Sequence, residues 1–193
     1  MSLKKVLTIA GSDTSGGAGI QADLKTFEEL DVYGMTSLTT IVAQDPHRDW
    51  FHAVYPQDTS VLEAQLETVL AGIGVDAAKT GMLGSMETVE LVAKKVEEYN
   101  VEKLVVDPVM VCKGADEALN PELDQYLRDA LVPKALVVTP NLFEASQLAG
   151  TGPVRTIDDM KEAAAKIYDL GPSFVIVKGG GETGDDKSID VLY

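Results

Sequence analysis

The sequence predicts an α/β domain with a mostly parallel central sheet and helices on both faces. Short runs of β-branched residues alternate with amphipathic segments, which is typical of βαβ units. At 193 residues, 45% of them hydrophobic, the chain is long enough to bury the core of one domain. No long linker, low-complexity tract or internal repeat divides it, so we expect a single domain over residues 1–193.

The expected elements follow one another along the whole chain. Runs rich in β-branched residues predict strands at 6–10, 37–43, 103–107, 135–138 and 174–178. A stretch of small residues after the first strand predicts a helix opening near Ala18. Ser60 and Glu63 have the spacing of a capping box, which predicts another helix start. Apolar residues at one-face spacing predict helices over 89–96 and 160–167.

The charge of the chain limits its partners. A formal net charge of −15 and a pI near 4.4 repel phosphodiester backbones and anionic lipids, so we expect neither nucleic-acid nor membrane partners. The apolar run after Lys5 stops at Gly11, too early for a signal or a membrane span, which favours a cytoplasmic protein. Cys112 is the single cysteine, so no internal disulfide can form.

Polar residues and glycines follow the expected strands at their carboxyl ends, the edge where open parallel sheets bind ligands. At a single position ordinary turn chemistry would explain such a residue, but agreement at six strand ends favours a binding rim. The residues along this rim are Gly11, Ser12, Asp13, Gln44, 79–82, Asp107, Thr139, Asn141 and 178–181.

Two glycine motifs bear on the nucleotide. Gly17, Gly19 and Ala22 have the G-x-G-x-x-A order of dinucleotide-binding loops, but they lie several residues beyond the predicted strand. A nicotinamide-dependent oxidoreductase is therefore kept only as an alternative, which predicts binding of NAD instead of ATP. The nearest approach to a P-loop, over residues 181–188, has Asp186 where the second glycine belongs.

A strand-to-helix junction carries Thr139, Asn141 and Glu144. The Glu144 carboxylate suits Mg²⁺, directly or through water, beside nucleotide phosphates. An ordinary helix start, with Asn141 near the N-cap and Glu144 offsetting free N–H groups, explains the same residues, and both interpretations stay open. Lys178, followed by Gly179 and Gly180, places a positive charge where phosphates could approach the backbone.

Five longer motifs stand along the chain: TIAGSDTSGGAGIQADLKTF from Thr8, KTGMLGS from Lys79, VVDPVMVCKG from Val105, VTPNLFEA from Val138 and VIVKGG from Val175. Together they resemble the ribokinase superfamily, in its branch of pyridoxal (pyridoxine) kinases and hydroxymethylpyrimidine (phosphate) kinases. Within this branch, the chain is most similar to the pyridoxal kinases of low-GC Gram-positive bacteria.

This resemblance implies a ribokinase-like fold, ATP and Mg²⁺ as cofactors, and a homodimer. It implies transfer of the ATP γ-phosphoryl group to the hydroxymethyl oxygen of pyridoxal or pyridoxine. By motif match, the heterocycle is bound by Ser12, Asp13, Gly19, Val42, Gln44, Met82 and Cys112. The residues that bind the nucleotide phosphates are Asp107, Thr139, Asn141, Lys178, Gly179 and Gly180. Those that bind Mg²⁺ are Asp107 and Glu144, the latter directly or through water.

The substrate stays open between two vitamin precursors. Residues 43–56 and 105–122 resemble pyridoxal kinases, whereas Gln44 is typical of pyrimidine kinases because its amide can pair with an aminopyrimidine edge. Dual activity and a dedicated hydroxymethylpyrimidine-phosphate kinase both remain alternatives. Cys112 lies in the family's covering loop; its thiolate adding reversibly to the pyridoxal aldehyde is one hypothesis, and a small loop residue without that role is the other.

Family members continue into a glycine-rich segment that forms the anion hole and supplies the catalytic base, whereas the sequence given ends in SIDVLY. We therefore expect a kinase domain truncated at its C-terminus, with the base unassigned in this chain. The alternative is a genuinely shortened protein that binds vitamer or nucleotide without turnover. If the chain does end at Tyr193, we expect binding without efficient phosphorylation.

Overall fold

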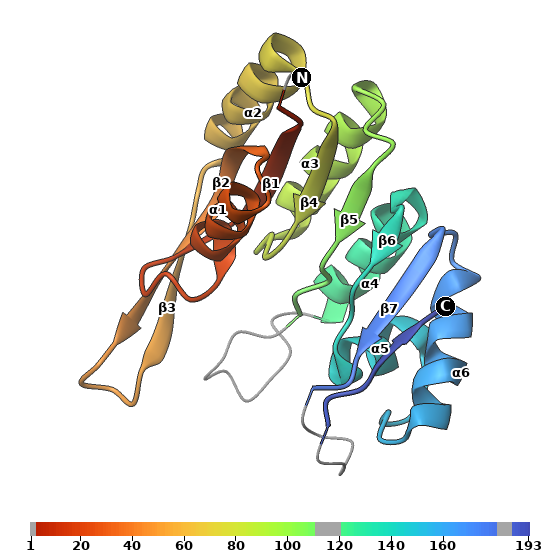
Figure 1. Cartoon of the computed structure of the whole chain (residues 1–193). Helices are drawn as coiled ribbons and strands as arrows, with labels where there is room; N and C mark the ends of the chain where they lie inside the picture. The colour runs from red at the N-terminus through yellow and green to blue at the C-terminus, as the bar shows by residue number, and fades with distance from the viewer. Residues whose placement is uncertain (1–2, 111–120, 181–186) are drawn as a thin grey trace.

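The computed structural model describes residues 3–110, 121–180 and 187–193, and its core is one eight-stranded sheet (Figure 1). The strand order is β3-β2-β1-β4-β5-β6-β7-β8. The strands are β1 (Lys5–Asp13), β2 (Tyr33–Asp45), β3 (Phe51–Pro56), β4 (Ala77–Thr80), β5 (Leu104–Val106), β6 (Val137–Val138), β7 (Phe174–Lys178) and β8 (Asp190–Leu192). Cys112 lies outside the described residues, so its reaction with an aldehyde stays a hypothesis.

Helices connect the parallel strands. They are α1 (Gly19–Glu29), α2 (Thr59–Glu67) with a π-helical extension η1 (Thr68–Ile73), α3 (Met86–Glu98), α4 (Pro121–Ala130), a 3₁₀ turn η2 (Val132–Lys134), α5 (Leu142–Ala149) and α6 (Ile157–Tyr168). Of the helices in the described part of the chain, none is both long and apolar enough to cross a membrane.

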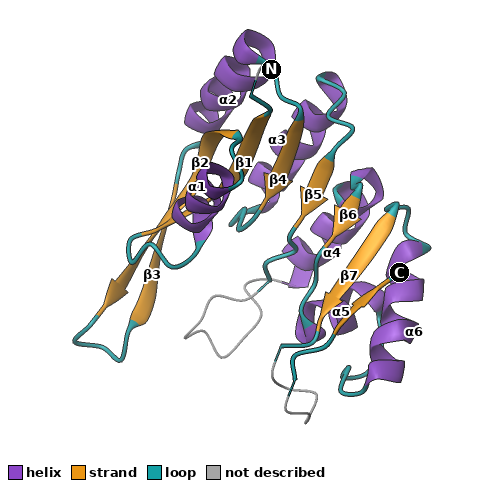
Figure 2. Ribbon diagram, viewed as in Figure 1, coloured by secondary structure: helices purple, strands orange, loops and turns teal. Residues whose placement is uncertain are grey.

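The sheet is parallel from β2 to β7, with β3 and β8 antiparallel at its edges. The chain moves from β1 to β2 in one direction, then crosses to β4 and continues in the other. Because such crossovers are right-handed, this reversal puts α1 on one face and the later helices on the opposite face (Figures 1 and 2). The predicted fold class, with helices on both faces, is confirmed.

The main core lies between the sheet and the layer of later helices. Leu7 and Ile9 of β1 face this layer, and the one-face spacing predicted for 89–96 buries Val89 and Val92 of α3 completely. Each such side chain contributes about 1.5–3 kcal/mol when it leaves water. This packing holds the carboxyl ends of β1, β4 and β5 in fixed positions, and the site is built on those ends.

Local details differ from the sequence prediction at one helix start and in the sheet. The N-cap of α2 is Asp58, whose carboxylate accepts from the Ser60 backbone N–H. The predicted Ser60–Glu63 capping box is therefore wrong: the helix begins before Ser60, and the Ser60 hydroxyl donates to Asp58 instead of accepting from the Glu63 N–H. The strands β1 and β2 are longer than predicted because polar residues pair as well as apolar ones. The strands β3, β4 and β8 were not among the runs predicted as strands.

Candidate functional site

A cavity of about 280 Å³ opens at the carboxyl edge of the sheet, beside the point where the strand order reverses between β1 and β4. Ligands of open α/β sheets bind at such switch points because the connecting loops diverge there. The cavity is lined by Ala10, Gly11, Ser12, Asp13, Ala18, Gly19, Val42, Gln44, His52, Lys79, Gly81, Met82, Asp107 and Val109. All the described residues predicted to bind the heterocycle are among them.

Asp13, the last residue of β1, organises the loop that forms one wall. Its carboxylate accepts hydrogen bonds from the backbone N–H groups of Ser15, Gly17 and Ala18 at 2.8–3.1 Å, and from the Ser15 hydroxyl and the Gln44 amide. Burial raises the pKa of Asp13, but the hydrogen bonds from Gln44 and Ser15 outweigh burial and lower the pKa to about 2. Asp13 is therefore a carboxylate at any functional pH.

Gly19 closes this loop against β1. Its φ is +58°, and a Cβ at this position would lie 2.3 Å from the Gly11 carbonyl oxygen, so only glycine permits the approach. The helix α1 starts here, with Ala18 as its N-cap, as predicted. Gly19 thus has a packing reason to be glycine, whereas a Cβ at Gly17 would meet no atom closer than 3.7 Å.

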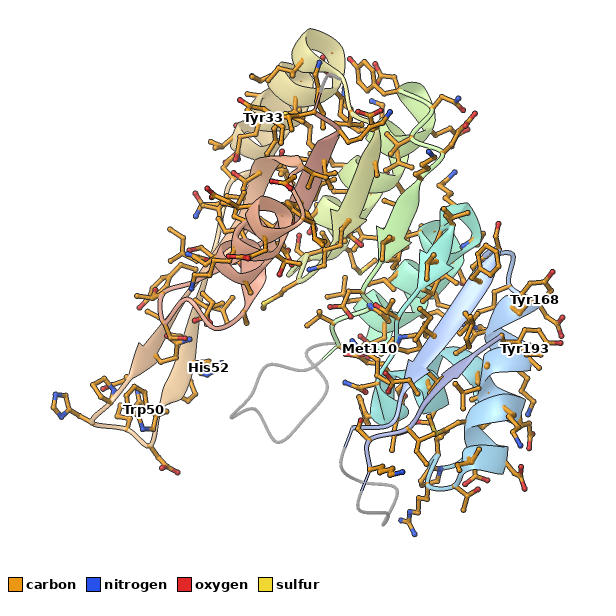
Figure 3. The ribbon with its side chains drawn as sticks, viewed as in Figure 1. Tyr33, Trp50, His52, Met110, Tyr168 and Tyr193 are labelled. Carbon is orange, nitrogen blue, oxygen red and sulfur yellow. The ribbon has the colours of Figure 1, made fainter. Side chains whose placement is uncertain are left out.

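The opposite wall comes from the β2–β3 hairpin and the β4 loop. Gln44 pairs across the hairpin with His52, which lies on the side that faces the rest of the sheet (Figure 3). The Val42 carbonyl accepts from both the backbone N–H and the hydroxyl of Thr14, which ties the α1 loop to β2. The Met82 carbonyl accepts from the Thr39 hydroxyl at 2.6 Å, which fixes the β4 loop.

An ion pair borders the cavity between β4 and α1. Lys79 Nζ lies 2.9 Å from Asp23 Oδ2, which also accepts from the Thr8 hydroxyl at 2.6 Å. Both charged side chains are largely buried. The pair ties α1 to the sheet and keeps a positive charge at the cavity wall.

A second group of polar residues lies along the next strand ends. Asp107 follows β5, and its Oδ1 accepts from Lys178 Nζ at 2.9 Å and from the Thr139 hydroxyl at 3.3 Å. Lys178 ends β7 with 42% of its side chain exposed. Because Asp107 also lines the cavity, it connects the two groups of residues.

Asn141 and Glu144 form a reciprocal capping box at the start of α5. Asn141 Oδ1 accepts from the Glu144 N–H, and Glu144 Oε2 accepts from the Asn141 N–H, each at 2.8 Å. The helix-start interpretation of these residues is therefore realised in the structure. Burial raises the pKa of Glu144 to about 7, although the hydrogen bond from Asn141 opposes this rise, and the negative charge of Asp107 adds to it.

The residues present suit one Mg²⁺ ion only in part. Among the described residues no group of three or more potential ligands exists, but Mg²⁺ in kinases needs only one or two carboxylates besides the nucleotide phosphates. Asp107 is partly exposed, whereas Glu144 is 5% exposed and committed to the capping box. Asp107 therefore fits as the direct ligand, and Glu144 fits as a neighbouring charge acting through water.

The glycines after β7 have separate reasons for being glycine. The Gly179 N–H donates to Asp190, and a Cβ there would lie 2.1 Å from the Ile189 carbonyl oxygen, so the approach of β8 requires it. Gly180 has a φ of +55° and open space around it. Of these two glycines, Gly180 is the one whose backbone N–H makes no hydrogen bond within the described part of the chain.

Two ionisable side chains of the cavity wall, His52 and Lys79, are among the lining residues for which the sequence predicted no individual role. The available signal for His52 was its position in the run FHAVYP, whose β-propensity predicts a strand pairing with the one that carries Gln44. For Lys79 the signal was its place at a strand end. Neither signal gives the direction of the side chain.

The fold and the site together define a class of protein, an open α/β sheet with a small-molecule cavity at its switch point and a charged cluster at the adjoining strand ends. The family model described as phosphomethylpyrimidine kinase matches residues 13–193. The chain belongs to this family, and its fold is ribokinase-like.

Named relatives agree with this assignment. The chain is 59% identical to the pyridoxine kinase of Bacillus subtilis, over 100% of this chain and 71% of that protein. An ADP complex of Bacillus subtilis pyridoxal kinase superposes with a TM-score of 0.96 at 59% identity, covering 100% of this chain and 72% of that one. The pyridoxal kinase of Staphylococcus aureus in complex with AMP-PCP and pyridoxal has a TM-score of 0.92 at 53% identity, covering 100% and 68%.

Proposed function

We propose that this protein is an ATP-dependent kinase that phosphorylates the hydroxymethyl group of pyridoxal or pyridoxine. One observation carries the proposal: Asp107 lies both in the wall of the cavity and in the ion pair with Lys178. A heterocycle in the cavity and a phosphate at Lys178 would therefore meet at one carboxylate. The cavity of about 280 Å³ has the size for a single small heterocycle, which argues against a dinucleotide.

In this proposal the heterocycle that accepts the phosphoryl group is bound by uncharged side chains. Ser12 and Gln44 provide hydrogen bonds to ring substituents, and the side chains of Val42 and Met82 pack against the ring. Gly19 lets the α1 loop approach the ring closely. The similarity in sequence and structure to a pyridoxal kinase solved in complex with pyridoxal supports this assignment.

The phosphate groups are held by charge and by free N–H groups. Lys178 offers a mobile point charge, Thr139 a hydroxyl and Gly180 a backbone N–H. Asn141 contributes through the start of α5, because its side chain is used by the capping box. When bound, Mg²⁺ at Asp107 would neutralise phosphate charge; no described residue is assigned as the base.

The experiment is an intact-mass measurement followed by an ATP assay against pyridoxal, pyridoxine and hydroxymethylpyrimidine. Phosphorylation of a B6 vitamer is expected, and titration of ADP and of each heterocycle separates binding from turnover. Turnover of the pyrimidine alone would instead identify a dedicated pyrimidine kinase, a candidate that Gln44 and the name of the matching family favour. Binding without turnover would support a non-catalytic role, and binding of NAD but not ADP would overturn the kinase proposal.

A single domain and a homodimer are parts of the same proposal. A single cooperative unfolding transition, seen alike by fluorescence and circular dichroism, is expected for one domain. Light scattering on the eluting protein is expected to give twice the chain mass of 20.6 kDa. A monomer at all concentrations would remove the dimer from the proposal.

A further inference from the structure

The carboxylate of Asp13 restricts its neighbour Gln44. A carboxylate can only accept hydrogen bonds, so the Gln44 amide must direct its NH₂ group toward Asp13, as it does. The amide therefore cannot turn over to exchange its two ends. Its carbonyl oxygen has no partner among the described residues, and Gln44 lines the cavity. The group that Gln44 holds ready for a ligand is a hydrogen-bond acceptor.

The backbone of Asp13 restricts a second amide by the same logic. A backbone N–H can only donate, and that of Asp13 donates to Gln21 Oε1 at 2.9 Å. Gln21 must then direct its NH₂ group to Ser12, whose Oγ accepts at 2.6 Å. Since Ser12 Oγ is already accepting, its own proton is left to donate. Ser12 therefore presents a hydrogen-bond donor in the cavity wall.

We propose that Asp13 is a positioning residue, which sets the hydrogen-bond polarity of the cavity through Gln44 and Gln21 without contacting the ligand itself. This inference rests on the proposed function. The cavity then selects a heteroaromatic ring with a donor substituent, facing Gln44, and an acceptor such as a ring nitrogen, facing Ser12. The phenolic hydroxyl of pyridoxine and the amino group of an aminopyrimidine can both donate to Gln44. Gln44 and Ser12 therefore select ligands by their donor and acceptor groups and do not distinguish a pyridine from a pyrimidine ring.

The decisive measurement is calorimetric binding of pyridoxine and of 3-deoxypyridoxine, which lacks the donor hydroxyl. The wild-type chain is expected to prefer pyridoxine by roughly 10- to 100-fold, because the bound analogue would cover the Gln44 carbonyl oxygen without giving it a hydrogen-bond donor. In Asp13→Asn the new amide can donate or accept, so Gln44 can adopt either orientation. The preference is then expected to fall to within about threefold.

Ser15→Ala is the matched control, because the Ser15 hydroxyl also donates to Asp13, and its loss leaves the hydrogen bond from Gln44 to Asp13 in place. It is expected to lower the melting temperature and to keep the preference for pyridoxine. If Asp13→Asn lowers the affinity for both ligands equally and keeps the preference, Asp13 has only a structural role and the inference fails.

Gln21→Glu tests the second amide and does not depend on whether Asp13→Asn folds. Glutamate still accepts from the Asp13 N–H but cannot donate to Ser12, so Ser12 must donate to it and the cavity loses its donor. Pyridoxine binding is expected to weaken about tenfold with the 3-hydroxyl preference unchanged. Unchanged pyridoxine binding would overturn the inference. A wild-type chain that binds neither ligand refutes the proposed function as well, whereas equal binding of both refutes this inference alone.

Discussion

The two parts of the site are built on different principles. The acceptor part, the wall around Asp13 and Gln44 that we propose binds the heterocycle, has one buried carboxylate that accepts hydrogen bonds from uncharged donors. The phosphate part, around Asp107 and Lys178, is an ion pair whose lysine is 42% exposed. Recognition of a neutral ring requires hydrogen-bond donors and acceptors in fixed positions, whereas recognition of a phosphate requires a charged side chain that can reach it.

We expect the greatest loss of stability and binding from a substitution of Gly19, in the loop before α1. In Gly19→Ala the new Cβ meets the Gly11 carbonyl in a left-handed backbone conformation, so stability should fall by roughly 2–4 kcal/mol and heterocycle binding should be lost. Urea unfolding and calorimetry measure both. Gly72→Ala is the control, because no atom lies within 4 Å of its Cβ position, and it should be neutral or slightly stabilising.

The next effect isolates the phosphate part. Lys178→Gln removes the charge but keeps a side chain of similar length, so ADP affinity should fall roughly 10- to 100-fold while pyridoxine affinity stays the same. Lys161→Gln, which removes an exposed charge on α6, should change neither affinity. Equal weakening of both ligands by Lys178→Gln would show that the two parts are not separable.

Glu144 gives a pH test of the phosphate part, without nucleotide or Mg²⁺. Its pKa in the folded state, about 7, lies above the usual 4.5, so the folded state retains a proton that the unfolded state has lost. Stability should therefore decrease as pH rises from about 4.5 to 7, by on the order of 2 kcal/mol. Glu144→Gln keeps the capping box and should abolish this decrease in urea unfolding measured at pH 5 and pH 8. A wild-type slope equal to that of the variant would contradict a raised pKa.

In the acceptor part, Asp13 should change stability with pH in the opposite direction to Glu144. Its folded pKa of about 2 lies below the usual 3.8, so its stabilisation is present above about pH 4 and is lost as pH falls toward 2. The stability difference between wild type and Asp13→Asn should shrink by about 1 kcal/mol between pH 5 and pH 2.5. A difference that is constant with pH would mean that the carboxylate is not held by these hydrogen bonds.

Much of the fold could be predicted because it depends on periodic patterns. The runs at 6–10 and 174–178 are strands, and the spacing over 89–96 and 160–167 gives α3 and α6. Capping was less predictable, because several polar residues near one helix start compete for the same N–H groups. The N-cap of α2 is Asp58 and not Ser60, whereas Asn141 and Glu144 form the capping box of α5 that their spacing allows.

The roles of the site residues were predicted by resemblance and remain proposals, but their placement shows what sequence order leaves open. The sequence was enough to predict that polar residues follow the strands at their carboxyl ends, because the order of the strands along the chain and the type of each side chain are read directly from it. The tertiary structure alone decided that Asp13 faces Gln44, that Asp107 joins the cavity to Lys178, and that His52 and Lys79 line the wall. These contacts join residues up to 71 positions apart, and only the register and packing of the sheet fix such distances.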